Sequence, residues 1–308
     1  MRDQARPLPT FEFVAPDSLT DALKLLQEGG ERARLIAGGT DMMLQLKNHT
    51  VQPEIVIDLG KILELSGVEL NNDVLHIGAT TTLNEIKNSP EIQQKAPLLL
   101  DVIDKFGSHM LRNRATVGGN LCHASPAADL APALLALDVS VRLQGVADER
   151  LVPLSEFFVS PGKTAKQPDE ILTKIEIPCR DGRSGYLKLG RRKGFNVSIV
   201  AVAAFGVITK EKVDDIRVAL CAVAPTPIRC RKAEESLIGN PLTEEFIDNA
   251  AQIVMQEVKQ ITDDREKSDI RRASPSYHRA SSPFRVEMSR RLTRKVLTTM
   301  SIEPGAEK

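Results

Sequence analysis

The 308-residue sequence lacks the features of several common protein classes. It contains no tryptophan and two tyrosines, and aromatic residues make up only 4% of it, which argues against a stacking surface for single-stranded nucleic acid. Basic and acidic residues number 41 each, so the formal net charge is zero and no attraction to nucleic acid or membranes is indicated. No apolar run approaches the roughly 18 residues of a membrane span, and the N-terminus has no apolar core of signal-peptide length. We therefore expect a cytoplasmic protein with no membrane span and no nucleic-acid partner.

Cysteine is scarce as well. The four cysteines form no CxxC pair and no zinc-ligand spacing (Cys122, Cys179, Cys221 and Cys230). We expect them to be reduced thiols. The one strongly basic stretch, residues 267–294, is expected to be a helix that faces solvent or another subunit.

The order of expected elements divides the chain into three α+β segments, of which the first covers residues 1–60. It begins with a short strand in PTFEFVAP and a helix over residues 18–28, where apolar residues recur at helical spacing before Gly29 and Gly30. A strand in ARLI then runs into a glycine turn, followed by a helix in MMLQLKN and a buried strand in EIVIDLG. This order predicts a βαβ-like unit.

The second segment, residues 61–180, starts with a strand and a helix in VLHIGATTTLNEI. Another helix is expected near residues 97–106, and VSVRLQGVADERLVPLSEFF has the pattern of a hairpin. EILTKIEIP alternates as a strand does, and we expect Ile171, Ile175 and Ile177 on one of its faces. The turn-forming PCRDG that follows predicts a domain boundary.

The third segment, residues 181–300, has a different pattern. GYLKLGRR, SIVAVAAFGVIT and VDDIRVALCAVAP predict three antiparallel strands. Helices are expected near residues 233–238, 244–259 and 282–300, and residues 301–308 form a tail. The fold class is therefore α+β.

The stretch IAGGTDMML, residues 36–44, carries the first chemical motif. A buried strand delivers two glycines, a hydroxyl and a carboxylate to the start of a helix. Glycine permits positive φ angles and close approach of a ligand, and exposed N–H groups at such a turn can bind an anion. A phosphate or diphosphate would suit the turn. A tight turn with Thr40 or Asp41 as the helix cap explains the same residues equally well.

The stretch ATVGGNLCHASPAADLAP, residues 115–132, repeats this pattern, and Thr116, Gly118 and Gly119 are expected at a strand end. Asn120 can donate and accept hydrogen bonds, and Asp129 can accept them from hydroxyl groups. Two such turns that converge on one ligand would suit a dinucleotide. Taken singly, Asn120 could be a turn residue and Asp129 a helix cap.

The sequence contains no complete motif for the other common kinds of nucleotide-binding or catalytic site. No GxGxxG, HExxH or GxSxG is present. The sequence Gly162-Lys163-Thr164 ends like a P-loop, but Phe157 occupies the position of its first glycine. Ser125, His123 and Asp129 lie near one another in sequence, yet no nucleophile elbow or oxyanion hole accompanies them.

Three stretches in this order, AGGTDMMLQLK, RNRATVGGNLCHASPAADLAPALLAL and EILTKIEIP, resemble the FAD-binding subunit of molybdenum hydroxylases. That family includes the medium chain of aerobic carbon monoxide dehydrogenase, the β subunit of 4-hydroxybenzoyl-CoA reductase and the flavin domain of xanthine oxidoreductase. The resemblance spans roughly residues 8–298. It implies an FAD-binding fold of the p-cresol methylhydroxylase and vanillyl-alcohol oxidase type. In that fold two α/β subdomains hold FAD, and a C-terminal domain with a three-stranded antiparallel sheet and helices covers the flavin.

The resemblance also implies which residues contact a non-covalently bound FAD. The first turn would hold the diphosphate (Ala37, Gly38, Gly39, Thr40 and Asp41), and Leu35 and Ile36 before it would also contact the cofactor. The second motif would contact the diphosphate and the ribityl and other hydroxyl-bearing parts (Thr116, Gly118, Gly119, Asn120, Ser125 and Asp129). Three further residues would lie near the isoalloxazine (Phe106, Leu172 and Lys188).

One departure from the family pattern bears on metal content. Members related to 4-hydroxybenzoyl-CoA reductase insert a cysteine-rich loop after GGNLC and bind a [4Fe–4S] cluster there. In this sequence Cys122 is followed directly by HASPAAD. We therefore expect no iron–sulfur cluster and no other metal in this chain, and no catalytic acid or base.

The resemblance implies partners and an electron path. A large molybdopterin-binding subunit and a small subunit with two [2Fe–2S] clusters would assemble with this chain as (αβγ)2. Electrons would pass through FAD to an acceptor such as NAD, a quinone or oxygen. We expect Arg290 and Arg291 of the last helix to face a partner subunit. Two alternatives are a free-standing FAD-dependent oxidase or reductase of the same fold superfamily and a non-enzymatic relic that has lost its flavin.

Overall fold

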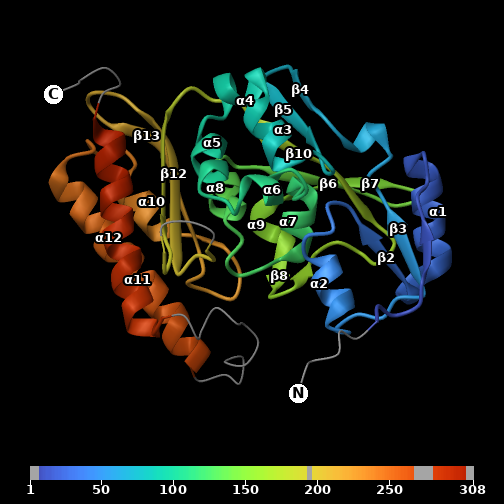
Figure 1. The fold of residues 1–308 in the computed structure, drawn as a ribbon. Coiled ribbons are helices and arrows are strands. Elements are labelled where there is room, and N and C mark those ends of the chain that lie inside the picture. The colour runs from blue at the N-terminus through green and yellow to red at the C-terminus, as the bar shows by residue number, and fades with distance from the viewer. Residues whose placement is uncertain (1–6, 193–195, 267–279, 303–308) are drawn as a thin grey trace.

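The computed structural model of the chain describes residues 7–192, 196–266 and 280–302, and Figure 1 shows its elements from the N-terminus in blue to the C-terminus in red. Three sheets of three or more strands follow one another across the molecule with their helices, and a fourth, two-stranded sheet accompanies the middle one. The α+β class is confirmed. The predicted boundaries near residues 60 and 180 fall between the sheets and stay predictions.

The N-terminal unit is a three-stranded sheet in which β1 and β2 both pair in parallel with β3. Its elements are β1 (Glu12–Val14), α1 (Leu19–Gly29), the 3₁₀ turn η1 (Gly30–Arg32), β2 (Ala33–Ile36), α2 (Met42–Lys47) and β3 (Ile55–Asp58). Ser18 caps α1 by accepting a hydrogen bond from the Asp21 amide, and Leu23 and Leu26 are buried on the helix. Gly30, at a φ of 52°, ends the helix as predicted.

The second unit is built on a five-stranded antiparallel sheet of order β4-β5-β10-β6-β7. Its strands are β4 (Val68–Asn71), β5 (Val74–Gly78), β6 (Ser140–Gln144), β7 (Glu149–Pro153) and β10 (Ile171–Pro178), beside the small hairpin of β8 (Phe158–Ser160) and β9 (Lys163–Thr164). Its helical elements are η2 (Leu63–Leu65), α3 (Leu83–Asn88), α4 (Pro90–Lys95), α5 (Leu98–Asp104), α6 (His109–Arg112), α7 (Val117–His123), α8 (Leu130–Ala136) and α9 (Leu154–Phe157). Strand β4 was not predicted, because four largely exposed residues carry no clear pattern.

Strand β10 corrects one expectation about its faces. The pairing of β10 with β6 shifts register between Leu172 and Lys174, which is a β-bulge. Because a one-residue shift reverses the side of every following residue, Leu172 joins Ile175 and Ile177 in the main core. Ile171 instead packs in the core of the N-terminal unit. The prediction that Ile171 shares a face with the other two isoleucines was therefore wrong.

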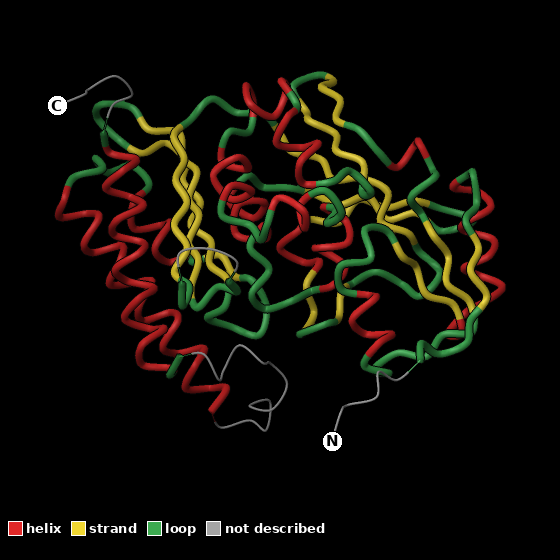
Figure 2. The backbone as a smooth tube through the Cα atoms, viewed as in Figure 1, coloured by secondary structure: helices red, strands yellow, loops and turns green. Residues whose placement is uncertain are grey.

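The C-terminal unit has the predicted antiparallel strands β11 (Arg183–Leu189), β12 (Val200–Ile208) and β13 (Val213–Cys221). A fourth strand, β14 (Ile228–Arg229), was not expected because it has only two residues. The helices α10 (Arg231–Leu237), α11 (Glu244–Glu266) and α12 (Ser282–Ser301) lie on one side of this sheet, as Figure 2 shows. Residues 267–279 of the basic stretch lie outside the described residues.

Both faces of the C-terminal sheet are buried. Along β12, Val200, Val202 and Ala204 pack with the C-terminal helices, whereas Ala201 and Ala203 pack into the core of the second unit. The continuous apolar run VAVAAF is what a strand covered on both sides requires. The sheet therefore joins the last helices to the second unit. Within the described ranges, no helix is both long and apolar enough to cross a membrane.

Candidate functional site

The structure brings the two glycine motifs against each other, although they lie far apart in sequence. A Cβ on Gly38 would stand 1.7 Å from the carbonyl oxygen of Arg114 and 3.3 Å from the Cα of Ala115. No side chain fits in that space, so glycine is required for the approach. Arg114 and Ala115 lead directly into Thr116. The turn of the N-terminal unit and the start of α7 in the second unit thus form one continuous surface.

The first motif follows β2 and has a half-buried backbone. Gly39 has a φ of 74°, which glycine adopts without strain, and the chain then enters α2 at Met42. Asp41 precedes this helix, but its side chain accepts no hydrogen bond from the helix backbone. Asp41 therefore occupies the N-cap position, as the alternative predicted, but it caps the helix through its backbone carbonyl oxygen, which accepts hydrogen bonds from the Leu44 and Gln45 amides. Its carboxylate Oδ1 lies 3.7 Å from the Nε2 of His123.

The second motif differs from the expected strand end. Gly118 and Gly119 lie in the first turn of α7, and the hydroxyl of Thr116 caps this helix by accepting a hydrogen bond from the Gly119 amide at 3.1 Å. Threonine before a helix is a strong N-cap, which explains the difference. Gly118 is packed tightly, because a Cβ there would stand 2.7 Å from the Ala79 carbonyl oxygen. Gly118 therefore serves close packing of the backbone, whereas Gly119 is exposed.

Asn120 provides an observation on which a cofactor can be tested. Its Oδ1 is buried and accepts no hydrogen bond from the residues that the structure describes. An unsatisfied buried acceptor costs about 1–3 kcal/mol, so such an atom is normally paired in the working protein. A hydroxyl-rich ligand that also carries a diphosphate would supply a donor next to the glycine motifs. The residues present therefore fit FAD.

Asp129 and Lys188 form a buried ion pair with 2.5 Å between Oδ2 and Nζ. Burial raises the pKa of the Asp129 carboxyl, while Lys188 and the hydroxyl of Ser198 oppose that shift. Lys188 also donates to the carbonyl oxygen of Lys105 at 3.2 Å, next to Phe106. The pair thus connects β11 of the C-terminal sheet with the start of α8 and the end of α5. Two residues predicted to contact FAD separately prove to be each other's partners.

The remaining predicted residues have varied surroundings. Phe106 is half-buried beside the main core, and its carbonyl oxygen accepts a hydrogen bond from Arg112 at 2.9 Å. Leu172 is buried in that core on β10, and Leu35 packs at the edge of the N-terminal core. The hydroxyl of Ser125 accepts from the Ala127 amide at 3.3 Å, so part of its bonding capacity stabilises the turn before α8.

Sequence reasoning missed Tyr186 and Ser198. The Tyr186 side chain is buried, its hydroxyl has no hydrogen-bond partner among the described residues, and the Lys105 ammonium lies 5.2 Å from its ring centroid. Burial, with the nearby Asp129 charge, raises the pKa of Tyr186 well above its usual value. Residues two apart on a strand share a face, so the identification of Lys188 could have indicated Tyr186 as well. Nothing local marks Ser198.

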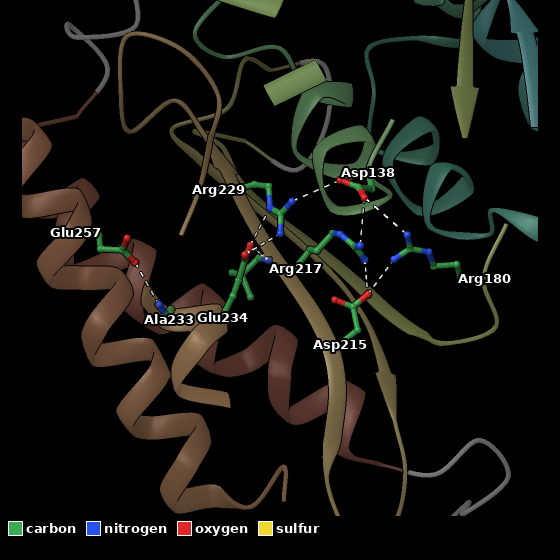
Figure 3. Close-up of polar contacts among 9 residues, drawn as sticks. Asp138, Arg180, Asp215, Arg217, Arg229, Ala233, Glu234 and Glu257 are labelled. Atoms are coloured by element: carbon green, nitrogen blue, oxygen red, sulfur yellow. Dashed lines mark hydrogen bonds and ion pairs between the residues drawn. The ribbon is translucent and has the colours of Figure 1, made fainter. Parts of the chain in front are cut away.

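Helix α8 is anchored to the C-terminal unit at both ends. Asp129 precedes its first residue, and Asp138 lies just beyond its last. As Figure 3 shows, Asp138 faces the guanidinium groups of Arg217 at 3.2 Å and Arg229 at 3.5 Å. A third guanidinium, that of Arg180, lies 3.8 Å away, while Asp215 and Glu234 offset the charge of the cluster. The cluster therefore fixes the helix that carries Asp129.

Cys122 and His123 end helix α7. Burial raises the pKa of the Cys122 thiol to about 11, with Lys166 opposing the shift. His123 faces Asp41, with 3.7 Å between Nε2 and Oδ1. Since Asp129 pairs with Lys188 instead, no Ser-His-Asp triad forms. All four cysteines are free thiols, and the described part of the chain has no cluster of three or more histidine, cysteine or acidic residues placed to hold a metal.

Comparison with known proteins decides the family. The family model for the FAD binding domain in molybdopterin dehydrogenase matches residues 9–180. The chain belongs to this FAD-binding family. The model for the carbon monoxide dehydrogenase flavoprotein C-terminal domain matches residues 185–274, which covers most of the third predicted segment.

Curated relatives of this FAD-binding chain match it over most of their length. The xanthine dehydrogenase FAD-binding subunit of Escherichia coli O157:H7 is 30% identical over 304 residues, covering 96% of this chain and 99% of the relative. The nicotinate dehydrogenase FAD-subunit of Eubacterium barkeri is 33% identical, covering 86% and 89%. The chain is thus an FAD-binding subunit of the molybdenum-containing hydroxylase and dehydrogenase class, and an oxidoreductase.

Solved structures show the same fold. A carbon monoxide dehydrogenase from Hydrogenophaga pseudoflava has a chain that superposes with a TM-score of 0.86 at 29% identity, covering 96% of this chain and 98% of that one. Quinoline 2-oxidoreductase from Pseudomonas putida 86 gives 0.84 at 26% identity, with the same coverage. The predicted fold and family are both confirmed.

Proposed function

We propose that this chain transfers electrons between the [2Fe–2S] clusters of a small subunit and an external acceptor through non-covalently bound FAD. A large molybdopterin-binding subunit would complete the complex, as (αβγ)2, in the cytoplasm. The observation that carries the proposal is the contact between Gly38 and Arg114, because it joins the two motifs into one surface for a diphosphate. Relatives named as medium chains of carbon monoxide dehydrogenase support the subunit role.

In this proposal the backbone of residues 35–41 holds the FAD diphosphate. The start of α7 approaches from the other side, where Gly119 is exposed and no described residue donates a hydrogen bond to the Asn120 Oδ1. Ser125 and Asp129 complete the polar side at the start of α8. When bound, FAD supplies two-electron and one-electron redox chemistry. The protein's own task is to bind it, orient it and shield it from water.

Lys188 and Asp129 set the electrostatics near the proposed flavin position. The Lys188 side chain is 5% exposed, so water screens its charge weakly. Such a cation favours negative charge gained on reduction, and Asp129 limits this effect by pairing with it. Phe106 and Leu172 provide apolar surface.

The absence of a linkage residue in the first turn supports non-covalent binding. The segment AGGTD contains neither histidine nor cysteine. At the second motif, Cys122 is a buried thiol with a raised pKa, which disfavours the thiolate that a covalent link would need. FAD should therefore be released intact when the chain is denatured.

The proposal also places the last helix against a partner subunit. Arg290 and Arg291 both pair with Glu287 on the same helix, at 2.7 and 2.6 Å. Arg291 nevertheless keeps 64% of its side chain exposed, so its charge stays available to a partner. Reversal of both charges should weaken assembly. An unchanged complex would count against this face as the interface.

Purification from the native source tests the proposal. A tag on this chain should recover a flavin-coloured complex with subunits that carry molybdenum and [2Fe–2S] clusters, and denaturation should release FAD. Recovery of a flavin-loaded chain alone, active with its own substrate, would favour the free-standing oxidase or reductase. A colourless chain that takes up no FAD would favour the relic that has lost its flavin.

A further inference from the structure

His123 and Asp41 form a cross-connection between the two glycine motifs. His123 is the last residue of α7, and Asp41 is the residue before α2. Their side chains meet with 3.7 Å between Nε2 and Oδ1 and remain 35% and 47% exposed. In Figure 1 these two helices lie side by side where the N-terminal and second units join. The pair therefore stands at the edge of the proposed diphosphate surface.

Asp41 caps α2 through its backbone, and its carboxylate makes no hydrogen bond to that helix. Among the described residues the ion pair recorded for this carboxylate is the one with His123. A carboxylate inside a diphosphate-binding turn repels its ligand. Two like charges about 4 Å apart repel each other weakly in bulk water and several times more strongly near a protein surface.

We propose that His123 is a cofactor-positioning residue whose contact with the Asp41 carboxylate offsets that group and so permits the FAD diphosphate to bind between α2 and α7. This inference rests on the proposed FAD site and assigns a role to a histidine outside the glycine motifs. Because the pair spans the two units, His123 also holds the first turn toward the second. An uncharged side chain at position 123 would leave the carboxylate facing the phosphates.

A double-mutant cycle on the full-length chain tests this role. The chain is freed of flavin, and the dissociation constant for added FAD is measured by quenching of flavin fluorescence. The variants are His123→Gln, Asp41→Asn, the double variant and His123→Lys, which keeps a positive charge. His76→Gln is the matched control, because His76 faces Glu176 at 3.8 Å in a comparable pair on the five-stranded sheet, outside both motifs.

We expect His123→Gln to weaken FAD binding about tenfold. The double variant should bind within about threefold of the wild type, because removing the carboxylate removes the group that His123 offsets. His123→Lys should bind FAD severalfold more tightly than His123→Gln does. The control His76→Gln should bind FAD as tightly as the wild type.

Two results would overturn the inference. One is an unchanged dissociation constant in His123→Gln, and the other is a double variant as weak as His123→Gln, which would indicate a structural role only. Thermal unfolding of the flavin-free variants tests for a structural role. If His123 acts only when FAD binds, the unfolding midpoints of these variants should lie close together. A wild-type chain that binds no FAD would instead refute the proposed function itself.

Discussion

The carbonyl oxygen of Arg114 lies 1.7 Å from the point at which a Cβ on Gly38 would stand. The contact is between two backbones, so no side-chain rotation can relieve a clash there. It holds the turn after β2 against the start of α7. The geometry of the proposed FAD surface therefore depends on the absence of one methyl group.

Gly38→Ala should consequently separate the two units. We expect a loss of about 3 kcal/mol in the free energy of unfolding, together with loss of bound FAD. Gly145→Ala is the control, since a Cβ there meets Asp148 at an ordinary 3.4 Å. Denaturant unfolding and the flavin-to-protein absorbance ratio measure both effects. A Gly38→Ala chain with full flavin content would contradict the role given to this contact.

Asn120→Ala should separate stability from binding. No described residue donates a hydrogen bond to the Asn120 Oδ1, so removing this atom breaks no hydrogen bond of Oδ1 in the flavin-free chain and should change its stability little. We expect FAD affinity to fall about tenfold while the thermal midpoint of the flavin-free chain stays within about 2 °C. Affinity equal to that of the wild type would show that the cofactor leaves this atom unpaired.

Lys188→Met should lower the midpoint potential of bound flavin. A buried cation stabilises added negative charge, and its removal should shift a two-electron couple by about 30 mV, equivalent to about 1.4 kcal/mol. Lys188→Arg keeps the charge and should keep most of the potential. Spectroelectrochemical titration of the flavin-loaded variants gives the values. Equal potentials in Lys188→Met and the wild type would place Lys188 outside electrostatic reach of the flavin.

Asp138→Asn should loosen the far end of α8. Asp138 has a φ of 59°, which asparagine tolerates well, so the substitution tests charge with little change of backbone geometry. It leaves the nearly buried Arg217 and Arg229 with fewer counter-ions, and we expect a loss of about 1–2 kcal/mol. The exposed Asp148→Asn should be neutral. Equilibrium unfolding in urea measures both variants, and an Asp138→Asn chain as stable as Asp148→Asn would contradict this role of Asp138.

Cys122 should resist alkylation near neutral pH. Burial raises its pKa to about 11, so the reactive thiolate is scarce at pH 8 and its fraction rises about tenfold with each pH unit up to that value. Labelling with iodoacetamide, followed by mass spectrometry of the native chain, should show this increase between pH 8 and 10. Rapid labelling of Cys122 at pH 7 in the folded chain would refute the assignment.

The sequence allowed most helices and strands to be predicted, because their signals are local. Ser18 and Thr82 cap helices that were predicted, and the alternation along EILTKIEIP marks a strand. Thr116 also caps a helix, although a strand end was expected there. Apolar runs such as VAVAAF require burial on two faces, which predicts a central strand. The glycine motifs were recognisable because close backbone approach permits few other residues.

The tertiary structure alone decided which distant residues meet. The pairs Gly38 with Arg114, Asp129 with Lys188 and His123 with Asp41 each join segments whose separation depends on the packing of whole units. No local pattern reports such a distance. The bulge that sends Ile171 to another core is likewise a compromise between neighbouring strands. The sequence by itself thus determined the elements and the kind of ligand, whereas the partners of each charge came from the fold, because charge pairing depends on proximity in space.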